Sequence, residues 1–566
     1  MNDSYTPDRR SRAARTPRWF SLALLWLVAG CPAIADSAPD AGSSPKAPGR
    51  ATPGGTLGVP RVNRAWIDEV YSPANPGPVW FIARSARPSL DVALRELKAA
   101  ADRGLVPDDY GVDVLEHELG ALADSGADPE RLARADRAVT ANVLRFLSDL
   151  RFGRVRPQEV EPHYHVPAKD APFVTGLREA VAHGRLAAMI DAAEPAFPLY
   201  AQLKRLLADY RLLAAQPAIV LPPLASPRAK IVAGDIYAGV PALRAQLERL
   251  GDLDADAADP ADDRYTGALA EAVRRFQKRH GLTPDGILGK DTLAALNVPL
   301  ATRVAQITLS LERLRWLPAL LPGPLIAINI PSFQLLAIAD AAAPGRAALS
   351  MPVVVGRAVR TETPVFVGEM RAVEFSPYWN VPPSILRHEI LPLLERDPSY
   401  ARREDLEVVG TGRDTEVYAV LDSAALAALR SGEARLRQRP GTRNALGGVK
   451  FVLPNAMNIY LHATPARKLF ERTRRDFSHG CIRVRDPEAL AQFVLRGKPE
   501  WTPEKIAAAM RSGVNQTVPL AAPVPVVVFY TTAIADAKGR ALFLADVYGH
   551  DRKLQDALSR GSGAAR

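Results

Sequence analysis

The sequence predicts a multidomain α+β protein with a helical scaffold, a small three-helix unit and a β-rich domain that carries a helical capping insertion. The chain has 566 residues, of which 47% are hydrophobic, enough to build several cores. Apolar residues recur at helical spacing through the first half of the chain. From Leu325 onward the apolar runs become short and rich in branched residues, which indicates strands. We therefore expect helices first and a sheet later.

Residues 1–35 have the pattern of an export signal. Arginines between Arg9 and Arg18 precede an apolar run over residues 19–29, which is shorter than the roughly 20 residues that a membrane span needs. The run is followed by a small-x-small cleavage pattern at 33–35 and by a lipoprotein-like pattern that ends at Cys31. We expect an exported, periplasmic protein, either cleaved in the ordinary way or attached to a membrane through a lipidated Cys31. Residues 36–60, rich in Ala, Pro, Ser and Gly, are expected to form a flexible linker.

Composition narrows the classes of partner. The formal net charge of +10 suits an anionic envelope polymer or membrane surface. No tract interleaves aromatic and basic residues, so we expect no nucleic-acid partner. Cys31 and Cys481 are the two cysteines, so removal of the export segment leaves Cys481 alone and allows no disulfide within the chain.

The helical scaffold is expected over residues 61–227. Val143, Leu144, Leu147 and Leu150 recur at spacings that place them on one helical face. A His163-x-His165 pair lies between prolines, but no carboxylate or cysteine cluster accompanies it. A surface or structural role therefore fits that pair better than a metal site, which needs three or four ligands.

The three-helix unit is expected over residues 228–300. Within 268–280, Leu269, Val273 and Phe276 share one face of an amphipathic helix, and Gly281 ends it. The pattern from Val273 to Thr292 resembles the peptidoglycan-binding module of cell-wall enzymes. The same apolar residues would also pack a three-helix core, so the pattern identifies the module without proving that it binds glycan.

The β-rich domain is expected over residues 301–550, followed by a tail at 551–566. Between about 385 and 440 the pattern becomes helical and charged, which indicates an insertion into the sheet domain. Its two ends lead toward strands that carry the motif described next. Such an element could cover a bound substrate.

Cys481 lies in the stretch Ser478-His-Gly-Cys-Ile-Arg483, and His462 lies upstream of it. A thiolate nucleophile needs a partner that takes the thiol proton, because an ordinary cysteine with a pKa near ~8.5 is mostly protonated at neutral pH. We choose His462, as imidazolium, for that role. His479 could instead be the base, but we favour a structural hydrogen bond for it. Two further interpretations are a buried apolar cysteine and a zinc site from His462, His479 and Cys481.

These residues together resemble the L,D-transpeptidase catalytic domain of YkuD type. The resemblance rests on the motifs Gly356, Thr363-Pro364, Asn444-x-x-Gly447, Tyr460-x-His462 and Ser478-His-Gly-Cys-x-Arg483. With the scaffold, the wall-binding module and the capping insertion, the order is similar to the large YcbB-like members. The resemblance implies 3-3 cross-links in peptidoglycan, made through a Cys481 thioester with release of D-Ala from a tetrapeptide stem. It implies no cofactor and no metal.

The remaining candidate residues surround the expected nucleophile. The backbone N–H groups of His479, Gly480 and Cys481 are candidates for the oxyanion hole. Arg483 and Tyr460 lie two residues from Cys481 and His462, so extended backbone would place each on its neighbour's face. The family resemblance implies that the carbonyl of the residue after the histidine, here Ala463, orients the His462 ring. The candidates for substrate binding are Arg483, Tyr460, Trp379, Asn444 and Ser478.

Other functions stay open at this point. The same thioester could be resolved by water, which would make the protein an L,D-carboxypeptidase or endopeptidase. A non-catalytic cell-wall tethering protein would keep the binding module and tolerate loss of Cys481. The resemblance also implies that carbapenem β-lactams acylate Cys481.

Overall fold

The structure is a computed structural model, and it describes most of the chain from Arg64 onward. The export segment with Cys31, the linker 36–60 and His165 lie outside the described residues. No helix among the described residues is both long enough and apolar enough to cross a membrane. The described ranges are 64–82, 85–124, 128–164, 169–254, 263–319, 322–341, 347–359, 361–411, 417–536 and 538–563.

The helical scaffold is built around α4 (Pro129–Phe152). The predicted apolar face is confirmed, because Val143, Leu144, Leu147 and Leu150 are all buried. Asp128 caps the helix by accepting the N–H of Glu130. The other elements of this region are α1 (Arg64–Val70), β1 (Phe81–Ile82), β2 (Ser85–Ala86), α2 (Pro88–Lys98), η1 (Ala99–Arg103), η2 (Pro107–Tyr110), α3 (Val112–Asp124), α5 (Pro157–Val160), α6 (Pro172–Ala182), α7 (Leu186–Ala193) and α8 (Pro198–Ala214).

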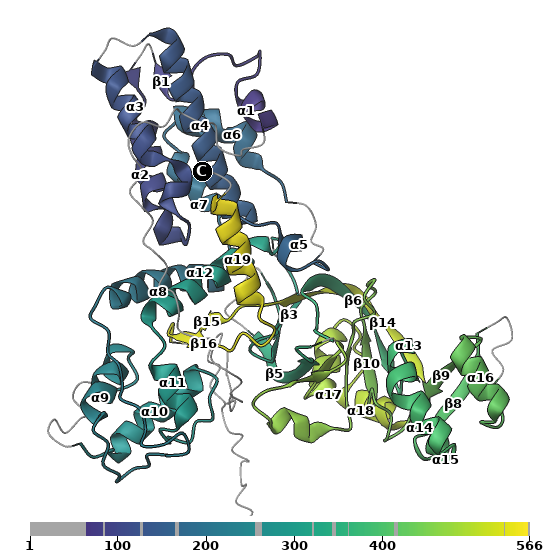
Figure 1. Ribbon diagram of the computed structural model, residues 1–566. Helices are drawn as coiled ribbons and strands as arrows, with labels where there is room; N and C mark the ends of the chain where they lie inside the picture. Colours follow the sequence, from purple (N-terminus) through teal and green to yellow (C-terminus); the bar gives the residue numbers. More distant parts are fainter. Residues whose placement is uncertain are drawn as a thin grey trace, which may run out of the picture.

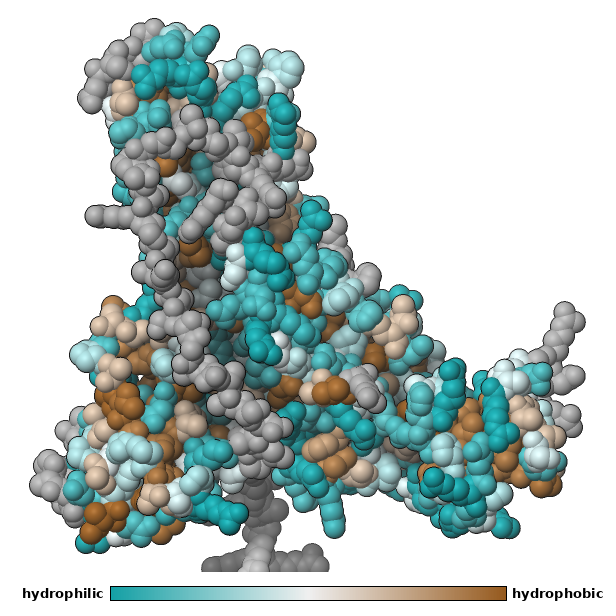
Figure 2. Space-filling view, in the orientation of Figure 1, coloured by the Kyte–Doolittle hydropathy of each residue, from teal (hydrophilic) through white to brown (hydrophobic). Residues whose placement is uncertain are grey.

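Three lobes meet around α8 and α12 (Leu300–Trp316), as Figure 1 shows. We placed residues from 301 onward in the β-rich domain, but α12 packs against α8, in a core that also contains the hairpin of β15 (Ala533–Ala535) and β16 (Ala541–Phe543). The sequence misleads here because α12 is buried on several sides and shows no distinct polar face. Apolar residues on the visible surface lie in several separate patches (Figure 2).

The three-helix unit consists of α9 (Val240–Arg249), α10 (Gly267–Arg279) and α11 (Lys290–Leu296). Thr266 caps α10 by accepting the N–H of Leu269. Gly281, predicted to end this helix, has the left-handed φ of 65° that favours glycine. The predicted apolar face of α10 forms the centre of the unit's own core.

The β-rich domain is a sheet that closes on itself. Among the described residues, nine strands form it in the order β12-β5-β13-β11-β10-β6-β14-β3-β4, and β4 also pairs with β5. The helical elements between β11 and β14 are η5 (Arg467–Glu471), α17 (Pro487–Val494) and α18 (Pro503–Arg511). The strands are β3 (Leu325–Asn329), β4 (Gln334–Ile338), β5 (Ala347–Gly356), β6 (Phe366–Phe375), β10 (Val449–Val452), β11 (Leu461–His462), β12 (Asp476–Ser478), β13 (Ile482–Val484) and β14 (Gln516–Phe529).

The insertion is not purely helical. It contains a three-stranded sheet in the order β7-β9-β8 and has its own hydrophobic core. The prediction of a helical insertion was therefore incomplete, because β8 and β9 are short strands of 5 residues each in a stretch that is charged throughout. Its elements are β7 (Trp379–Asn380), α13 (Pro383–Ile385), the π-helical turn η4 (Leu386–Ile390), α14 (Leu391–Arg396), α15 (Ser399–Arg403), β8 (Leu406–Gly410), α16 (Ser423–Ser431) and β9 (Ala434–Gln438).

The expected tail at 551–566 is wrong for its described part. Residues 550–563 form the helix α19 (His550–Gly563). Leu554 and Ala557 are buried in the main core of the β-rich domain, and the helix contacts α5 and α12. The few apolar residues of this segment hid a helix that is held by packing.

Candidate functional site

Cys481 and His462 are brought together by two neighbouring parallel strands. In the pairing of β11 with β13, Leu461 lies opposite Ile482 and His462 lies opposite Arg483. Leu461 and Ile482 are fully buried and point into the core. Because side chains alternate along a strand, the residues on either side of this pair share the other face. The register therefore puts Tyr460 beside Cys481, and His462 beside Arg483, on one surface of the sheet.

The same register adds a lysine that the sequence analysis missed. Lys450 on β10 lies opposite His462, and its own partner on β6 is Glu374. The Lys450 ammonium is 3.2 Å from the Glu374 carboxylate and 4.9 Å from the centre of the Tyr460 ring. The only hint of Lys450 in the sequence was its position as a single lysine between two apolar residues, Val449 and Phe451, which are buried. Nothing in the sequence showed which strand would pair with it.

Cys481 is a free thiol whose surroundings favour the protonated form. Burial raises the pKa of the Cys481 thiol, and this outweighs the backbone and hydroxyl groups of Tyr460, with Lys450 and Arg483, that lower it. The sulfur lies 3.7 Å from the carbonyl oxygen of Asn458. Burial also raises the pKa of Tyr460, and the nearby Cys481 raises it further.

His462 is held in one orientation by the backbone. Its Nδ1 lies 2.5 Å from the carbonyl oxygen of Ala463. A carbonyl only accepts, so Nδ1 carries the proton and donates it. This fixes the neutral tautomer in which Nε2 has the free lone pair that a base needs. The structure thus places the Ala463 carbonyl where the family resemblance implied it.

The surroundings of the imidazole also favour its neutral form. Burial, followed by the positive charge of Arg483, lowers the pKa of His462 to about 3. Lys450 acts in the same direction, while the carbonyls of Ala463 and Leu446 oppose it. The expected imidazolium that would ionise the thiol is therefore not favoured at rest. Both pKa shifts favour a neutral thiol and a neutral imidazole.

The loop that carries Cys481 is fixed by its own hydrogen bonds. The Ser478 hydroxyl donates to the Cys481 carbonyl at 2.6 Å and accepts the Gly480 N–H at 3.2 Å. Gly480 has a φ of 110°, a conformation that side chains disfavour. The Gly480 N–H is thus engaged inside the loop, which corrects its expected role in an oxyanion hole. His479 and Cys481 keep backbone N–H groups for which the described residues provide no acceptor.

The side chain of His479 turns toward the insertion. Its Nε2 lies 2.6 Å from the carboxylate of Glu389 in η4. His479 thus connects the loop that carries Cys481 with the insertion. This contact disfavours the alternative in which His479 is the base. Among the described residues, no group of three or more His, Cys, Asp or Glu side chains is arranged to hold a metal ion. His462, His479 and Cys481 do not form such a group.

Arg483 has a donor that is left unpaired within the part of the chain that the structure describes. Its Nε is buried and has no hydrogen-bond partner among the described residues. Burial lowers the pKa of Arg483, and the neighbouring Arg357 lowers it further, while Cys481 opposes them. A buried, unpaired guanidinium N–H next to the thiol fits a substrate carboxylate or carbonyl as the missing acceptor.

Three residues that the sequence predicts as substrate contacts have partners within the protein itself. Asn444 is buried, and its amide donates to the carbonyls of Pro377 and Arg439 at the two ends of the insertion. Ser478 is also buried and serves the catalytic loop itself. Trp379 pairs with Gln438 and packs against the core of the insertion. Asn444 and Ser478 belong to the sequence motifs, but the motifs did not reveal these structural contacts.

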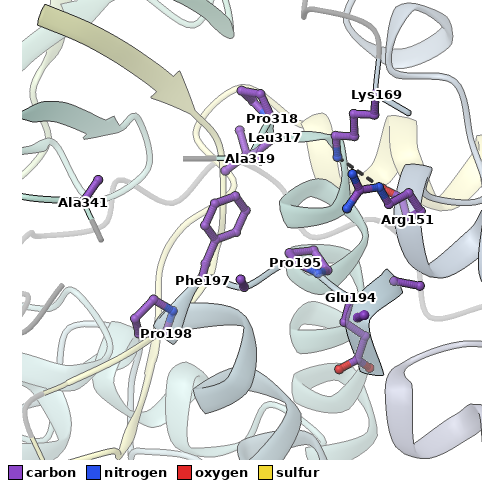
Figure 3. A pocket seen from close by; sticks show the side chains of 13 residues that line it. Arg151, Lys169, Glu194, Pro195, Phe197, Pro198, Leu317, Pro318, Ala319 and Ala341 are labelled. Atoms are coloured by element: carbon purple, nitrogen blue, oxygen red, sulfur yellow. Dashed lines mark hydrogen bonds between the residues drawn. The ribbon is translucent and has the colours of Figure 1, made fainter. Parts of the chain in front are cut away.

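A cavity of about 330 Å³ lies elsewhere, at the junction of the scaffold and the β-rich domain. Figure 3 shows Lys169 and Arg151 beside one another, with Phe197 and Leu317 also on the lining. The Lys169 ammonium donates to the carbonyls of Arg151 and Arg315, which lie in the last turns of α4 and α12. None of the candidate site residues lines this cavity.

A thiol and a neutral imidazole on adjacent strands, with free backbone N–H groups next to the sulfur, define a site suited to acyl transfer. The family described as "L,D-transpeptidase catalytic domain" matches residues 323–506. A "Scaffold domain" matches residues 65–207, and a "Putative peptidoglycan binding domain" matches residues 237–296. The chain therefore carries an L,D-transpeptidase catalytic domain of the YkuD family together with a peptidoglycan-binding domain.

A related protein and a solved structure also match this chain. A protein of Haemophilus influenzae named "Putative L,D-transpeptidase" is 31% identical over 249 residues. The match covers 44% of this chain and 48% of the relative, so this chain spans about half of that protein's length. A crystal structure of an L,D-transpeptidase, residues 123–326, from Xylanimonas cellulosilytica is 17% identical, with 54% of this chain and 100% of that chain covered and a TM-score of 0.17.

Proposed function

We propose that this protein is a peptidoglycan L,D-transpeptidase that forms 3-3 cross-links through a thioester on Cys481. The observation that carries the proposal is the pairing of β11 with β13, which sets the thiol of Cys481 on the same surface as a His462 ring whose Nδ1 is held by the Ala463 carbonyl. The catalytic-domain and peptidoglycan-binding matches support the substrate class.

In the first half-reaction, the Cys481 sulfur attacks the carbonyl carbon of the third stem residue while Nε2 of His462 takes the thiol proton. The oxyanion that forms accepts hydrogen bonds from the backbone N–H groups of Cys481 and His479. The C–N bond to D-Ala then breaks, and His462 gives its proton to the departing amine. A thioester remains on Cys481.

In the second half-reaction, an acceptor amine attacks the thioester and loses a proton to His462. The C–S bond breaks, the sulfur recovers a proton from His462, and the new amide is the cross-link. Each half-reaction begins and ends with the neutral imidazole that burial favours. Arg483, with its unpaired Nε, holds a carboxylate or carbonyl of the donor, and Tyr460 lines the donor pocket beside the sulfur.

The proposed setting is the cell wall outside the cytoplasm. A protein with a peptidoglycan-binding domain and a transpeptidase domain has its substrate outside the inner membrane, so it must be exported. The periplasm is the proposed compartment, with attachment through a lipidated Cys31 as the alternative to a soluble form. Carbapenems are proposed to acylate Cys481, because a strained ring carbonyl presents the same kind of acyl group to the same thiol.

The deciding experiment is mass spectrometry of the purified protein, wild type and Cys481→Ala, after incubation with disaccharide tetrapeptide. A cross-linked dimer lacking one D-Ala, made by the wild type alone, is the expected result. Tripeptide without dimer would instead indicate an L,D-carboxypeptidase or endopeptidase. Absence of any product from both proteins would favour a tethering protein.

A further inference from the structure

The loop that carries Cys481 is braced by residues outside its own motif. The hydroxyl of Thr363 donates to the Gly480 carbonyl at 2.7 Å and accepts the Gly356 N–H at 2.8 Å. The hydroxyl of Tyr548 donates to the Gly356 carbonyl at 2.7 Å and accepts the Thr363 N–H at 3.2 Å. Two hydroxyl groups and three backbone units thus form one closed set of hydrogen bonds.

This set of hydrogen bonds is buried and has little freedom to rearrange. Thr363 is fully buried and Tyr548 is 6% exposed. A Cβ added to Gly356 would lie 1.9 Å from the carbonyl oxygen of Thr361, so the chain passes too closely for any other residue. Tyr548 is itself held, because its N–H donates to the Tyr530 hydroxyl at 3.1 Å.

The brace controls the direction of the candidate oxyanion donor. A trans peptide is planar, so its C=O and N–H point in opposite directions. The carbonyl of Gly480 and the N–H of Cys481 belong to one peptide. A hydrogen bond from Thr363 to that carbonyl therefore fixes the Cys481 N–H so that it points away from Thr363. The Thr361 hydroxyl and the Arg357 N–H hold the Ser478 carbonyl in the same way, and that peptide carries the His479 N–H.

We propose that Tyr548 and Thr363 are positioning residues that hold the Cys481 N–H in place to stabilise the oxyanion during acyl transfer. The proposal rests on the proposed function. Tyr548 lies beyond residue 506, where the match to the catalytic domain ends. The working site therefore includes the C-terminal segment, which reaches back to the catalytic loop.

The test compares two reactions of the same sulfur. Acylation by disaccharide tetrapeptide develops an oxyanion, whereas alkylation by iodoacetamide does not. For Tyr548→Phe and Thr363→Val we expect kcat for acylation to fall between about ten-fold and a hundred-fold with little change in KM, because a misplaced donor loses much of its effect. The rate of alkylation should stay at the wild-type value. Thr363→Ser, which keeps the hydroxyl, should restore acylation.

Tyr265→Phe is the matched control. Tyr265 is fully buried in the three-helix unit, and its hydroxyl donates to the Gly286 carbonyl at 2.7 Å. The Tyr265→Phe variant therefore loses a comparable hydrogen bond far from Cys481. Its rates of acylation and alkylation should both stay at the wild-type values. If Tyr548→Phe does not fold, as judged by thermal melting, the pair Thr363→Val and Thr363→Ser carries the test.

Several outcomes would overturn the proposal. Wild-type acylation by both Tyr548→Phe and Thr363→Val would show that the brace is not needed. Equal losses in acylation and alkylation would mean that the brace serves the nucleophile in general. Acylation of the wild type at Cys481 tests the proposed function separately. If Cys481 is not the nucleophile, the wild type is not acylated at this residue, while its alkylation by iodoacetamide still proceeds.

Discussion

Burial sets the ionisation of Cys481 and His462 more than any neighbouring charge. It raises the pKa of the thiol and, with Arg483, lowers the pKa of the imidazole to about 3. Both shifts disfavour the thiolate–imidazolium pair that many cysteine nucleophiles use. The proposed mechanism therefore requires that the thiol proton be removed during attack.

The pH dependence of alkylation tests the state of the thiol. Because the pKa of Cys481 is raised, the thiolate fraction should still be growing at pH 8.5. We expect the rate constant for iodoacetamide to rise about ten-fold for each pH unit between 7 and 8.5, as for any group below its pKa. Mass spectrometry of the alkylated protein gives the rates. A plateau below pH 7 would instead reveal a stable thiolate–imidazolium pair.

The acid side of the acylation profile tests His462. In the proposed mechanism the neutral imidazole is the base, and a pKa of about 3 keeps it neutral at every pH well above that value. We therefore expect kcat/KM for acylation to stay within about two-fold between pH 7.5 and 5.5, since the base is lost only as the pH falls toward 3. Stopped samples analysed by mass spectrometry give kcat/KM. A ten-fold fall with a midpoint near 6.5 would contradict the burial argument.

The elements of the site differ in how much the sequence reveals. The faces of α4 and α10 follow from apolar spacing, and the motif around Cys481 is contiguous, so all of these could be predicted. The position of Lys450 could not be predicted, because its place beside His462 depends on the register of β10 with β11. The contact of Tyr548 with Gly356 and Thr363 could not be predicted either, since residues so far apart in the chain leave no local sequence pattern. Strands β8 and β9 and helix α19 were missed because packing, rather than a clear apolar pattern, holds them.

The insertion contacts the catalytic loop through Glu389 and His479, and this contact can be tested. The pair is partly exposed, and such pairs contribute about 0.2–1 kcal/mol. Glu389→Ala should therefore increase amide hydrogen exchange across residues 383–391 and change kcat/KM by no more than about five-fold. Hydrogen exchange with mass spectrometry measures the first effect, and acylation kinetics the second.

Glu395→Ala is the control for that experiment. Glu395 lies in the same insertion and pairs with Arg430, also within the insertion. Its loss should leave kcat/KM at the wild-type value. Equal exchange across 383–391 in Glu389→Ala and wild type would show that the insertion is held by other contacts.

Buried polar contacts join the three lobes across the whole molecule. His550 at the start of α19 is an ion-pair partner of Glu161 after α5 and of Glu362 in the β-rich domain. Arg279 of the peptidoglycan-binding domain donates to the Ala541 carbonyl in β16 at 2.6 Å and pairs with the buried Asp252. The end of α10 is thus used for docking against the rest of the protein.

Asp252→Ala tests that docking. The substitution leaves the buried Arg279 guanidinium without its carboxylate, which typically costs about 3–5 kcal/mol. We expect the peptidoglycan-binding domain to loosen from β16 and to be cut by trypsin faster than in the wild type. Glu271→Ala removes an exposed pair with Arg274 on the same helix and should cost under about 0.5 kcal/mol, with no change in proteolysis. If both variants resist trypsin as the wild type does, the docking contact is held by apolar packing around His280 and Phe543, whose ring centres lie 5.8 Å apart.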